Sequence, residues 1–388
     1  MNKLAVITST RAEYGLLYPL LQKLYKEETI DMHLLVSGTH LLEKYGHTID
    51  YIRNDGIPIA YEIPILNENF LSDEENVTKA VAEATRQCGS IFAKERYDAI
   101  IVLGDRYELL GFCSAAVVCR IPIIHIHGGE ISEGAIDDKI RHAITKMSSI
   151  HFPSIPEYAK RIIQMGENPD RVYSVGALGI DNVMNLQLLE KEELLDELNI
   201  CTTLPIAAVT YHPVTGNSPE LAVDEMKQVL NALINKNIYA IVTMPNSDVG
   251  GDDIFETIVA YVNKYPDRII LKKSLGQVKY LSLLNCVDIM VGNSSSGIIE
   301  SASFRLPTVN IGDRQKGRMS PKNVIHCECE QYKIEEAIEY CLKMETRNAL
   351  KDYINPYGDG RTAEKIMSII KTLDFNDNTL VCKKFYDK

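Results

Sequence analysis

The sequence predicts an α/β protein made of two doubly wound, Rossmann-like units. Short apolar runs alternate with longer helical patterns along the whole chain, which is typical of βα units. Many of these runs are continuous and end in glycine, asparagine or another polar residue, as parallel strands buried on both faces do. A length of 388 residues also exceeds one ordinary core, so two domains are expected.

Two series of apolar runs are the expected strands. The first comprises Leu4–Thr8, His33–Val36, Ala99–Leu103, Pro122–Ile126, Ile150–Pro153 and Tyr173–Val175. The second comprises Ala207–Tyr211, Tyr239–Met244, Ile269–Leu271, Ile289–Val291 and Thr308–Ile311. Helical patterns lie between them, for example at Leu16–Glu27, Val77–Lys94, Pro219–Ile234 and Tyr332–Met344.

The junction between the two series is expected near residue 178. There the last run of the first series ends in Gly176-Ala177-Leu178-Gly179, and a polar helical pattern follows. We therefore expect an N-terminal unit over residues 1–178 and a C-terminal unit over residues 179–361. The two units should be alike in architecture and face each other across a cleft.

Composition excludes several classes of protein. The chain carries 41 Lys+Arg against 53 Asp+Glu, a net charge of -12, which argues against non-specific nucleic-acid binding. A hydrophobic fraction of 45% argues against wholesale disorder. Arg120 interrupts the longest apolar run, Gly111–Ile126, and no signal-peptide pattern is present. We expect a soluble, cytoplasmic protein with no membrane partner.

The cysteines give no sign of a disulfide framework or a zinc ribbon. There are nine of them, an odd number, and no CxxC motif occurs. The run His326-Cys327-Glu328-Cys329 could be a metal cluster, but a strand with alternating faces is the favoured interpretation. The sequence therefore predicts neither a metal site nor a cofactor.

Ligands of open α/β sheets bind beyond the carboxyl ends of the strands, so polar residues at those ends are candidates for chemistry. Arg11 follows the first strand at a turn where a guanidinium could hold an anion, or it could be a surface residue pairing with Glu13. Asp105 and Arg106 follow the third strand. Asp105 is placed either for acid/base work or to cap the next helix.

The densest group of ionisable residues follows the strand at Pro122–Ile126. It reads His127-Gly128-Gly129-Glu130, with Asp137, Asp138, Arg141 and His142 close behind. The glycines would let backbone approach a ligand, and two carboxylates could be held at different pKa values. Asp137 and Arg141 are four residues apart, so they could pair on one helix face. The simpler alternative is a salt-bridged helix start.

The second half offers further polar strand ends. His212 follows a strand, and a histidine there is expected to titrate near working pH and to suit proton transfer, although it could also merely pack against or cap the turn. Asn246 could bind a ligand or make an Asx-turn. Ser294, Ser295, Ser296 and Gly297 would open a helix and form a phosphate cradle.

Two more features complete this second group. Glu300, one turn into the helix expected after Gly297, could take a ribose diol by bidentate hydrogen bonding. Arg314 lies in the loop Gly312–Arg318, a second basic strand end fit to face a nucleotide. The serine-rich motif is neither a Walker A nor a GxGxxG sequence, so a P-loop NTPase and an NAD enzyme are both excluded by it.

These motifs together resemble the UDP-N-acetylglucosamine 2-epimerase family over nearly the whole chain. The residues that carry the resemblance are Ser9–Gly15, Gly104–Arg106, His125–Glu130, Ile136–Asp138, Arg141–Lys146, Tyr211–Pro213, Gly292–Gly297, Gly312–Gln315 and Asn355–Gly360. The turn His127-Gly128-Gly129-Glu130 is similar to that of the hydrolysing branch, which releases free UDP. The resemblance implies a GT-B-like fold whose last helix, Thr362–Leu373, crosses back to the N-terminal domain.

The implied reaction has two steps. UDP leaves from C1 of the sugar while a base removes the C2 proton, and water then adds to the resulting 2-acetamidoglucal with inversion at C2. By matching position, the catalytic candidates are Asp105, Glu130, Asp137 and His212. The substrate-binding candidates are Arg11, Arg106, Asn246, Ser294, Ser295, Ser296, Gly297, Glu300 and Arg314.

The expected substrate is UDP-N-acetylglucosamine, converted with water to N-acetylmannosamine and UDP. One alternative within the family is UDP-2,4-diacetamido-2,4,6-trideoxyglucose, because the motifs bind UDP and act at C1 and C2 without reporting on C4 or C6. A GT-B glycosyltransferase and a non-catalytic nucleotide-sugar sensor are further alternatives. The resemblance also implies a homodimer or a homotetramer.

Overall fold

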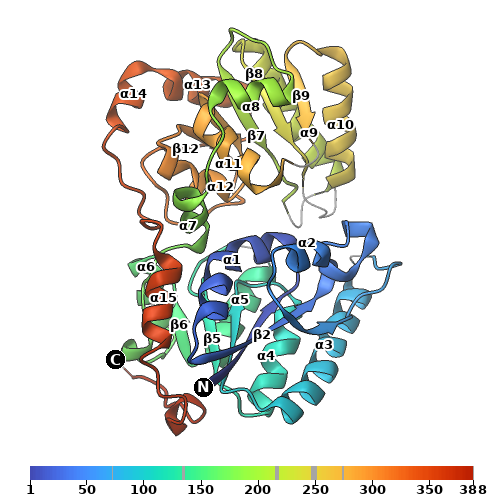
Figure 1. Cartoon of the computed structure of the whole chain (residues 1–388). Coiled ribbons are helices and arrows are strands. Elements are labelled where there is room, and N and C mark those ends of the chain that lie inside the picture. The colour runs from blue at the N-terminus through green and yellow to red at the C-terminus, as the bar shows by residue number, and fades with distance from the viewer. Residues whose placement is uncertain (72, 133–135, 215–217, 246–250, 273–274, 388) are drawn as a thin grey trace. The chain divides into compact units, whose positions relative to one another are not determined.

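The computed structural model describes residues 1–71, 73–132, 136–214, 218–245, 251–272 and 275–387. The chain forms two compact units (Figure 1). Unit 1 contains Met1–Asn182 and Tyr357–Lys388, and unit 2 contains Val183–Pro356. The junction lies within helix α7 (Leu178–Asn185), a few residues beyond the expected position, because Leu178 packs in a core of unit 1 whereas Val183 packs in a core of unit 2.

Unit 1 is built on a six-stranded parallel sheet with the order β3-β2-β1-β4-β5-β6. Its strands are β1 (Asn2–Thr8), β2 (Ile30–Ser37), β3 (Ile59–Ile63), β4 (Ala99–Leu103), β5 (Ile123–Ile126) and β6 (Ile150–Phe152). The strand order reverses between β1 and β4. The carboxyl ends of these two neighbours therefore mark the topological switch point at which doubly wound sheets bind ligands.

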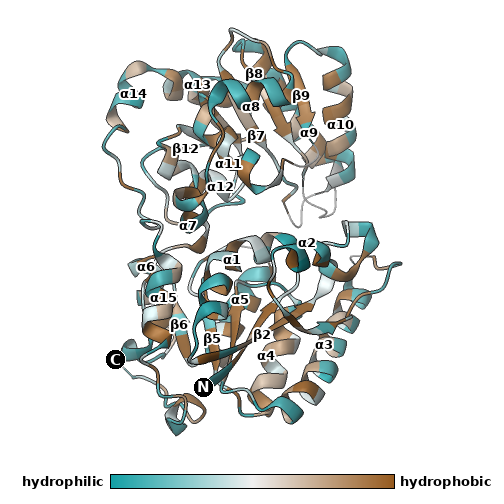
Figure 2. Cartoon of the chain, viewed as in Figure 1, coloured by the Kyte–Doolittle hydropathy of each residue, from teal (hydrophilic) through white to brown (hydrophobic). Residues whose placement is uncertain are grey.

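Helices cover both faces of this sheet and each face has its own core. The helices are α1 (Arg11–Lys26), α2 (Ile49–Asn54), α3 (Glu74–Glu95), α4 (Glu108–Val118), α5 (Ile136–Met147), α6 (Pro156–Gln164), α7 and α15 (Thr362–Ile370), with 3₁₀ turns η1 (Gly38–Leu41), η2 (Glu43–Tyr45), η3 (Pro169–Arg171) and η5 (Asn378–Leu380). Along β1, Leu4 and Val6 enter one core while Ala5 and Ile7 enter the other. Figure 2 shows the hydrophobic residues gathered along the strands, as expected for a sheet buried on both faces.

Helix α15 returns the chain to unit 1. Its residues Ala363, Ile366 and Ile370 pack in the core that also holds α1. The carboxylate of Asp181 accepts hydrogen bonds from the backbone N–H groups of Thr362 (2.8 Å) and Ala363 (2.7 Å) and so caps this helix. The expectation that the last helix crosses back to the N-terminal domain is confirmed, although the helix ends at Ile370 rather than at Leu373.

Unit 2 repeats the architecture with the strand order β12-β11-β10-β7-β8-β9, again all parallel. Its strands are β7 (Ile206–Thr210), β8 (Tyr239–Thr243), β9 (Ile269–Lys272), β10 (Ile289–Gly292), β11 (Thr308–Ile311) and β12 (Val324–Cys327). Its helices are α8 (Lys191–Leu198), α9 (Pro219–Asn235), α10 (Gly251–Lys264), α11 (Gly276–Cys286), α12 (Ser296–Ile299), α13 (Gln331–Leu342) and α14 (Met344–Ala349), with the 3₁₀ turn η4 (Ser301–Phe304). The predicted fold class, α/β with two doubly wound sheets, is confirmed.

Three local expectations were wrong. Tyr173–Val175 is not a strand, since only a single bridge joins His151 to Val172 beside it. Strand β3 was missed because it is an edge strand with a half-exposed alternating pattern rather than a continuous apolar run. Helix α1 begins at Arg11 rather than Leu16, because the Thr10 hydroxyl accepts the Glu13 N–H (3.3 Å) and caps it.

The longest apolar run is divided between two elements. Residues Gly111–Val118 belong to α4, and after a turn at Arg120, whose φ is 59°, the chain enters β5. Within the described part of the chain, no helix has the length and apolar character needed to cross a membrane.

Gly292 ends β10 in a backbone conformation that only glycine adopts readily. Its φ is 143°, and a Cβ at this position would lie 2.0 Å from the carbonyl oxygen of Thr210, its partner on β7. We expect Gly292→Ala to lower the free energy of unfolding of the protein by about 1–3 kcal/mol, measured by denaturant titration. Gly312→Ala is the matched control, because Gly312 also has a positive φ (70°) but nothing within 4 Å of its Cβ position. Equal losses would show that the close approach to Thr210 is unimportant.

Candidate active site

Arg141 joins the ends of two strands in unit 1. It lies on α5 and its side chain is only 2% exposed. Its guanidinium forms an ion pair with the Asp105 carboxylate after β4, and it donates to the Glu130 carbonyl oxygen after β5 (2.9 Å). It also donates to the side chains of Ser132 (3.1 Å) and Asp138 (3.4 Å). Because a guanidinium has five donors in a fixed plane, these contacts hold the two strand ends and the helix in one arrangement.

Asp105 is part of this arrangement rather than a helix cap. The N-cap position of α4 is Tyr107, and no side chain caps that helix. The Asp105 side chain keeps 27% of its surface exposed while it pairs with Arg141. Of the two roles considered from sequence, capping is therefore wrong, and the carboxylate stays accessible to a ligand.

The turn after β5 is shaped by close packing inside the protein. A Cβ on Gly128 would lie 2.9 Å from the His125 Nδ1, and one on Gly129 would lie 2.5 Å from the Tyr158 carbonyl oxygen. His127 itself has a φ of 63°, and its Nδ1 lies 3.5 Å from the Glu130 carboxylate. From sequence, these glycines were expected to make room for a ligand. In the structure, glycine is needed at both positions because a side chain would clash with neighbouring protein atoms.

Asp137 and Asp138 lie in the first turn of α5, and the ion pairs formed along this helix differ from the expected ones. Arg141 and His142 both contact Asp138, at 3.4 Å and 3.5 Å, so the ion pair that was expected from Asp137 to Arg141 is made by Asp138 instead. Asp137 is half-buried in the same first turn. Asp105, Glu130 and Asp137 are thus carried by segments that Arg141 contacts directly or through the adjacent residue.

Glu13 is a buried carboxyl group in the first turn of α1 and was not among the residues predicted from sequence. It is 5% exposed, and its Oε2 accepts hydrogen bonds from the Ser9 backbone N–H (2.6 Å) and the Ser9 hydroxyl (3.0 Å). Burial raises the pKa of Glu13 to about 7, against the lowering effect of the Ser9 hydrogen bonds. Arg11 does not pair with it, and the Arg11 guanidinium lies 4.8 Å from the Tyr51 ring centroid instead.

Arg106 interacts electrostatically with Glu13 and is held by the carboxylate of Glu108. Its Nε donates to Glu108 Oε1 (2.8 Å), and Glu108 is 1% exposed. Burial works against the charge of the guanidinium, yet the Glu108 carboxylate raises the pKa of Arg106 above its usual value. The Arg106 side chain keeps 38% of its surface exposed, so it can reach a ligand at the switch point.

In unit 2, the buried side chain of Asn293 joins the ends of β7 and β10. Its Oδ1 accepts from the His212 backbone N–H and its Nδ2 donates to the His212 carbonyl oxygen, both at 2.8 Å. The Asn293 carbonyl oxygen accepts from Arg314 (3.1 Å) and from Gln315 (2.9 Å). His212 and Arg314, two candidates from distant parts of the sequence, are therefore brought together.

His212 does not titrate near working pH, contrary to the sequence expectation. Burial, and then the positive charge of Arg314, lower the pKa of His212 to about 3. The imidazole is therefore neutral under ordinary conditions. A neutral ring can still donate or accept a hydrogen bond, so its role here is polar contact rather than charge.

The serine-rich motif forms a shorter helix than expected. Helix α12 is a single turn, Ser296–Ile299, and Glu300 is its C-cap rather than a residue inside it. The Ser294 hydroxyl accepts a hydrogen bond from the Ser296 backbone N–H (3.4 Å). A one-turn helix has little dipole, so hydroxyls and backbone N–H groups would have to hold a phosphate here. Asn246 lies outside the described residues.

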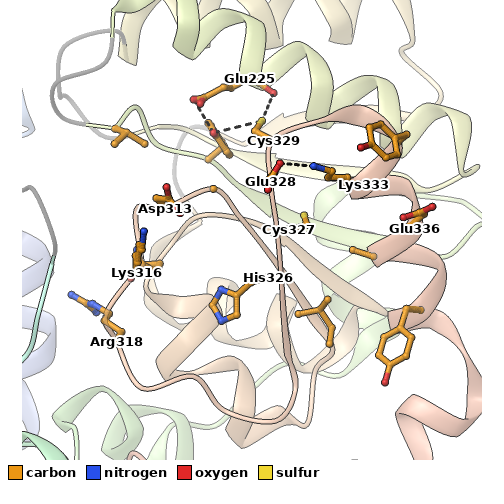
Figure 3. A pocket seen from close by; sticks show the side chains of 18 of the residues that line it. Glu225, Asp313, Lys316, Arg318, His326, Cys327, Glu328, Cys329, Lys333 and Glu336 are labelled. Atoms are coloured by element: carbon orange, nitrogen blue, oxygen red, sulfur yellow. Dashed lines mark hydrogen bonds and ion pairs between the residues drawn. The ribbon is translucent and has the colours of Figure 1, made fainter.

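The basic loop Gly312–Arg318 lies beside a pocket of about 1290 Å³ in unit 2 (Figure 3). The pocket is also lined by β12 and α13. Its charges are mixed: Lys333 pairs with Glu328 and with Glu330 (2.8 Å), and the buried Tyr211 hydroxyl donates to Glu225 (2.9 Å). The pocket therefore lacks the surplus of positive charge expected of an anion site.

Strand β12 (Val324–Cys327) ends inside the His326–Cys329 run, so His326 and Cys327 lie in a strand, as favoured from sequence, whereas Glu328 and Cys329 follow it. His326 hydrogen-bonds with Asn310 (3.1 Å) and Ser320 (2.7 Å). No group of three histidine, cysteine or acidic side chains suited to a metal ion occurs among the residues that the structure describes.

Two fully buried histidines support the candidate site in unit 1 and should make the protein sensitive to acid. His125 hydrogen-bonds with the Gly104 carbonyl oxygen (2.8 Å), and His40 with the Thr8 hydroxyl (3.1 Å). Burial lowers the pKa of His125 to about 3 and that of His40 to about 4. The unfolded chain binds these protons below pH 6.5, so stability should fall as the pH drops from 6.5 toward 4, by up to ~1.4 kcal/mol per pH unit for each histidine.

Unfolding titrations of the wild type and of His125→Gln at several pH values between 4.5 and 7.5 measure this effect. In the variant, the free energy of unfolding should depend less steeply on pH, because the contribution of His125 is missing. Identical slopes in the two proteins would contradict a buried neutral imidazole.

Two doubly wound parallel sheets with polar groups at the carboxyl ends of their strands define the GT-B-like class of α/β proteins. The family model for UDP-N-acetylglucosamine 2-epimerases matches residues 22–371. The chain belongs to this family, and its resemblance to the hydrolysing branch is confirmed by relatives that carry that activity in their names.

Three relatives illustrate the match. A GDP/UDP-N,N'-diacetylbacillosamine 2-epimerase (hydrolysing) of Campylobacter jejuni is 36% identical over 100% of this chain and 99% of that protein. A UDP-N,N'-diacetylbacillosamine 2-epimerase (hydrolysing) of Legionella pneumophila is 34% identical over 98% of each chain. A UDP-N-acetylglucosamine 2-epimerase of Neisseria meningitidis is 30% identical over 100% and 99%.

Solved structures share the fold. The structure of Staphylococcus aureus MnaA with UDP covers 100% of both chains with a TM-score of 0.78 at 18% sequence identity. This likeness extends over both units.

Proposed function

We propose that this protein is a hydrolysing 2-epimerase of UDP-2,4-diacetamido-2,4,6-trideoxyglucose, the compound also called UDP-N,N'-diacetylbacillosamine. The proposal replaces the sequence expectation of UDP-N-acetylglucosamine. It is supported by the two relatives at 34% and 36% identity, both named for the diacetamido sugar.

The observation that carries the catalytic part of the proposal is the contact of Arg141 with both strand ends. Through Arg141, the carboxylate of Asp105 and the segment that bears Glu130 are fixed at the carboxyl ends of β4 and β5. Asp137 lies at the start of the helix that supplies Arg141. Several carboxylates at one sheet edge are what an elimination with positive charge developing at C1 requires.

The reaction proceeds by elimination and hydration. In the first step, the C1–O bond breaks with its electron pair leaving on UDP, and the C2 proton passes to a carboxylate, giving the 2-acetamidoglucal. In the second step, a carboxylate takes a proton from water as the water oxygen bonds to C1, and a proton is delivered to C2 on the face opposite to the one that was deprotonated. We assign the proton transfers and the stabilisation of charge at C1 to Asp105, Glu130 and Asp137.

We assign contacts to UDP within each unit by itself. In unit 1 the candidates for the diphosphate are Arg11 and Arg106, and in unit 2 they are His212, Ser294, Ser295, Ser296 and Gly297. Arg314 and Asn246 would lie nearby, and Glu300 would take the ribose diol. Neutral His212 suits a hydrogen bond to the leaving group, and arginine suits its charge.

UDP-N-acetylglucosamine is a second candidate substrate because the Neisseria meningitidis relative, at 30% identity, is named for it. The proposed residues act at C1 and C2 of the sugar and bind UDP, and both substrates have these parts in common. The choice between the sugars therefore depends on groups around C4 and C6.

The decisive experiment is to incubate the pure protein with each nucleotide sugar in deuterated water and follow the products by NMR. We expect free UDP and the 2-epimerised diacetamido sugar with deuterium at C2, without any added acceptor. Turnover of UDP-N-acetylglucosamine alone would select the second candidate. No UDP release from either sugar, or release only when an acceptor is added, would overturn the proposal and favour a sensor or a glycosyltransferase.

A further inference from the structure

Unit 1 contains two buried carboxyl groups at its switch point, besides the catalytic candidates already described. The pair is Glu13, at the start of α1, and Glu108, at the start of α4. Their exposures are 5% and 1%, and each has one oxygen (Glu13 Oε1, Glu108 Oε2) that finds no hydrogen-bond partner among the residues that the structure describes. Arg106 lies between β4 and α4, and its charge interacts with both carboxyl groups.

We propose that Glu108 and Glu13 are positioning residues that fix the Arg106 guanidinium where the diphosphate of the substrate binds. The inference rests on the proposed function, since it concerns the anion which that function requires. Glu108 acts through the 2.8 Å hydrogen bond to Nε, which leaves the outer edge of the guanidinium for a phosphate. Glu13 acts through its charge state.

The charge balance explains why Glu13 matters. With both carboxyls ionised, two negative charges would surround one guanidinium, and the cluster would repel a diphosphate. Burial and the neighbouring Glu108 both favour the neutral form of Glu13, whose pKa is raised to about 7. Neutral Glu13 leaves Arg106 and Glu108 as a balanced pair, so that an incoming anion meets no excess negative charge.

Binding and protonation must then be linked. An anion bound at Arg106 would disfavour a second ionised carboxylate nearby, so UDP binding should promote protonation of Glu13 near pH 7. The charged groups acting on Glu13 are Glu108 and Arg106. His40, which contacts Thr8 at the end of β1, has its pKa lowered to about 4 and stays neutral in this range.

The experiment is calorimetric titration of UDP into the full-length protein at pH 7 in buffers of different ionisation enthalpy. The wild type should take up more protons on binding than Glu13→Gln, by up to about half a proton per site, since a group with a pKa near 7 is half ionised there. The titration of the phosphate itself is common to both proteins and cancels. Glu28→Gln, which removes an exposed carboxyl from the same region of the chain, should behave as the wild type.

The pH dependence gives a second readout. Above pH 7 the dissociation constant of the wild type for UDP should rise by up to ~10-fold per pH unit relative to that of Glu13→Gln. Glu108→Gln provides a test that does not need the first variant to fold. This variant should bind UDP more weakly than the wild type. Its loss of UDP affinity with rising pH should also begin at a lower pH, because the Glu108 charge helps to raise the pKa of Glu13.

The outcomes separate the two proposals. The positioning role would be overturned by equal proton uptake in the wild type and Glu13→Gln, or by a pH dependence of UDP binding in Glu108→Gln that is not shifted from that of the wild type. The proposed function would still stand in that case, provided that the wild type binds UDP. Failure of the wild type to bind UDP at all would overturn both.

Discussion

Asp105→Asn, Glu130→Gln and Asp137→Asn should each lower turnover of the nucleotide sugar at least ~10²-fold while UDP binding is retained. Removing a proton-transfer group typically costs a factor of 10²–10⁴. The UDP contacts that we assign lie on other residues, so binding of the leaving group should survive. A loss confined to turnover is the sign of groups that act on the sugar.

The three substitutions test different environments. Asp105 is ion-paired with buried Arg141, so its amide variant also removes a charge partner. Glu130 is nearly buried and faces His127 at 3.5 Å. Asp137 lies half-buried in the first turn of α5. If one carboxylate serves mainly as a structural partner of Arg141, its variant should lose thermal stability along with activity, whereas a pure proton carrier should lose activity alone.

Single-turnover and steady-state kinetics on the sugar, with UDP affinity from calorimetry, measure this prediction. Asp253→Asn is a matched control, because Asp253 is an exposed acid in the first turn of α10, in unit 2. It should be fully active. Full activity in all three site variants would mean that the site has been misplaced.

Much of the fold follows from local patterns in the sequence. A parallel strand buried on both faces must be apolar at every position, and β4, with all five residues buried, is recognisable from its composition alone. Strand β3 escapes this rule because an edge position lets polar and apolar residues alternate, as Tyr61 and Glu62 do. The run Tyr173–Val175 also reads as a strand, but its backbone donates only from Tyr173 to His151 of β6 and from Val175 to Pro153, which does not make a ladder.

The candidate site was only partly predictable, because side chains that contact one another in it come from distant parts of the sequence. The strand-end rule located Asp105 and Glu130, but spacing suggested Asp137 as the partner of Arg141, whereas the ion pairs formed are to Asp105 and Asp138. Glu13 looks like an ordinary first-turn acid, and only the burial of the β1 end reveals it. The neutral state of His212 likewise depends on burial and on Arg314, a hundred residues away.

Arg141→Met should be the most damaging single substitution in unit 1. It removes four contacts of a side chain that is 2% exposed and leaves the Asp105 carboxylate without its cation. Breaking a buried ion pair by removing one partner costs about 3–5 kcal/mol. Because the same guanidinium fixes the Asp105 side chain and the Glu130 backbone, we also expect turnover to fall at least ~10²-fold.

Arg141→Lys separates charge from geometry. Lysine keeps the positive charge but cannot present donors in a plane to the Glu130 carbonyl, Ser132 and Asp105 together. The lysine variant should therefore recover much of the stability and little of the turnover. Recovery of both would mean that Arg141 contributes charge alone.

A double-mutant cycle completes the argument. In Asp105→Asn with Arg141→Met, position 105 no longer carries a charge that has lost its cation, and only Asp138 has lost an arginine partner, so the loss of unfolding free energy should be smaller than the sum of the two single losses. The size of that difference measures the Asp105–Arg141 coupling, and turnover should stay as low as in the worse single variant, since either change alone removes the arrangement on which the elimination depends. Additive stability losses would show that the two side chains do not act together, and Arg141 would then serve the fold through its contacts to the Glu130 backbone, Ser132 and Asp138.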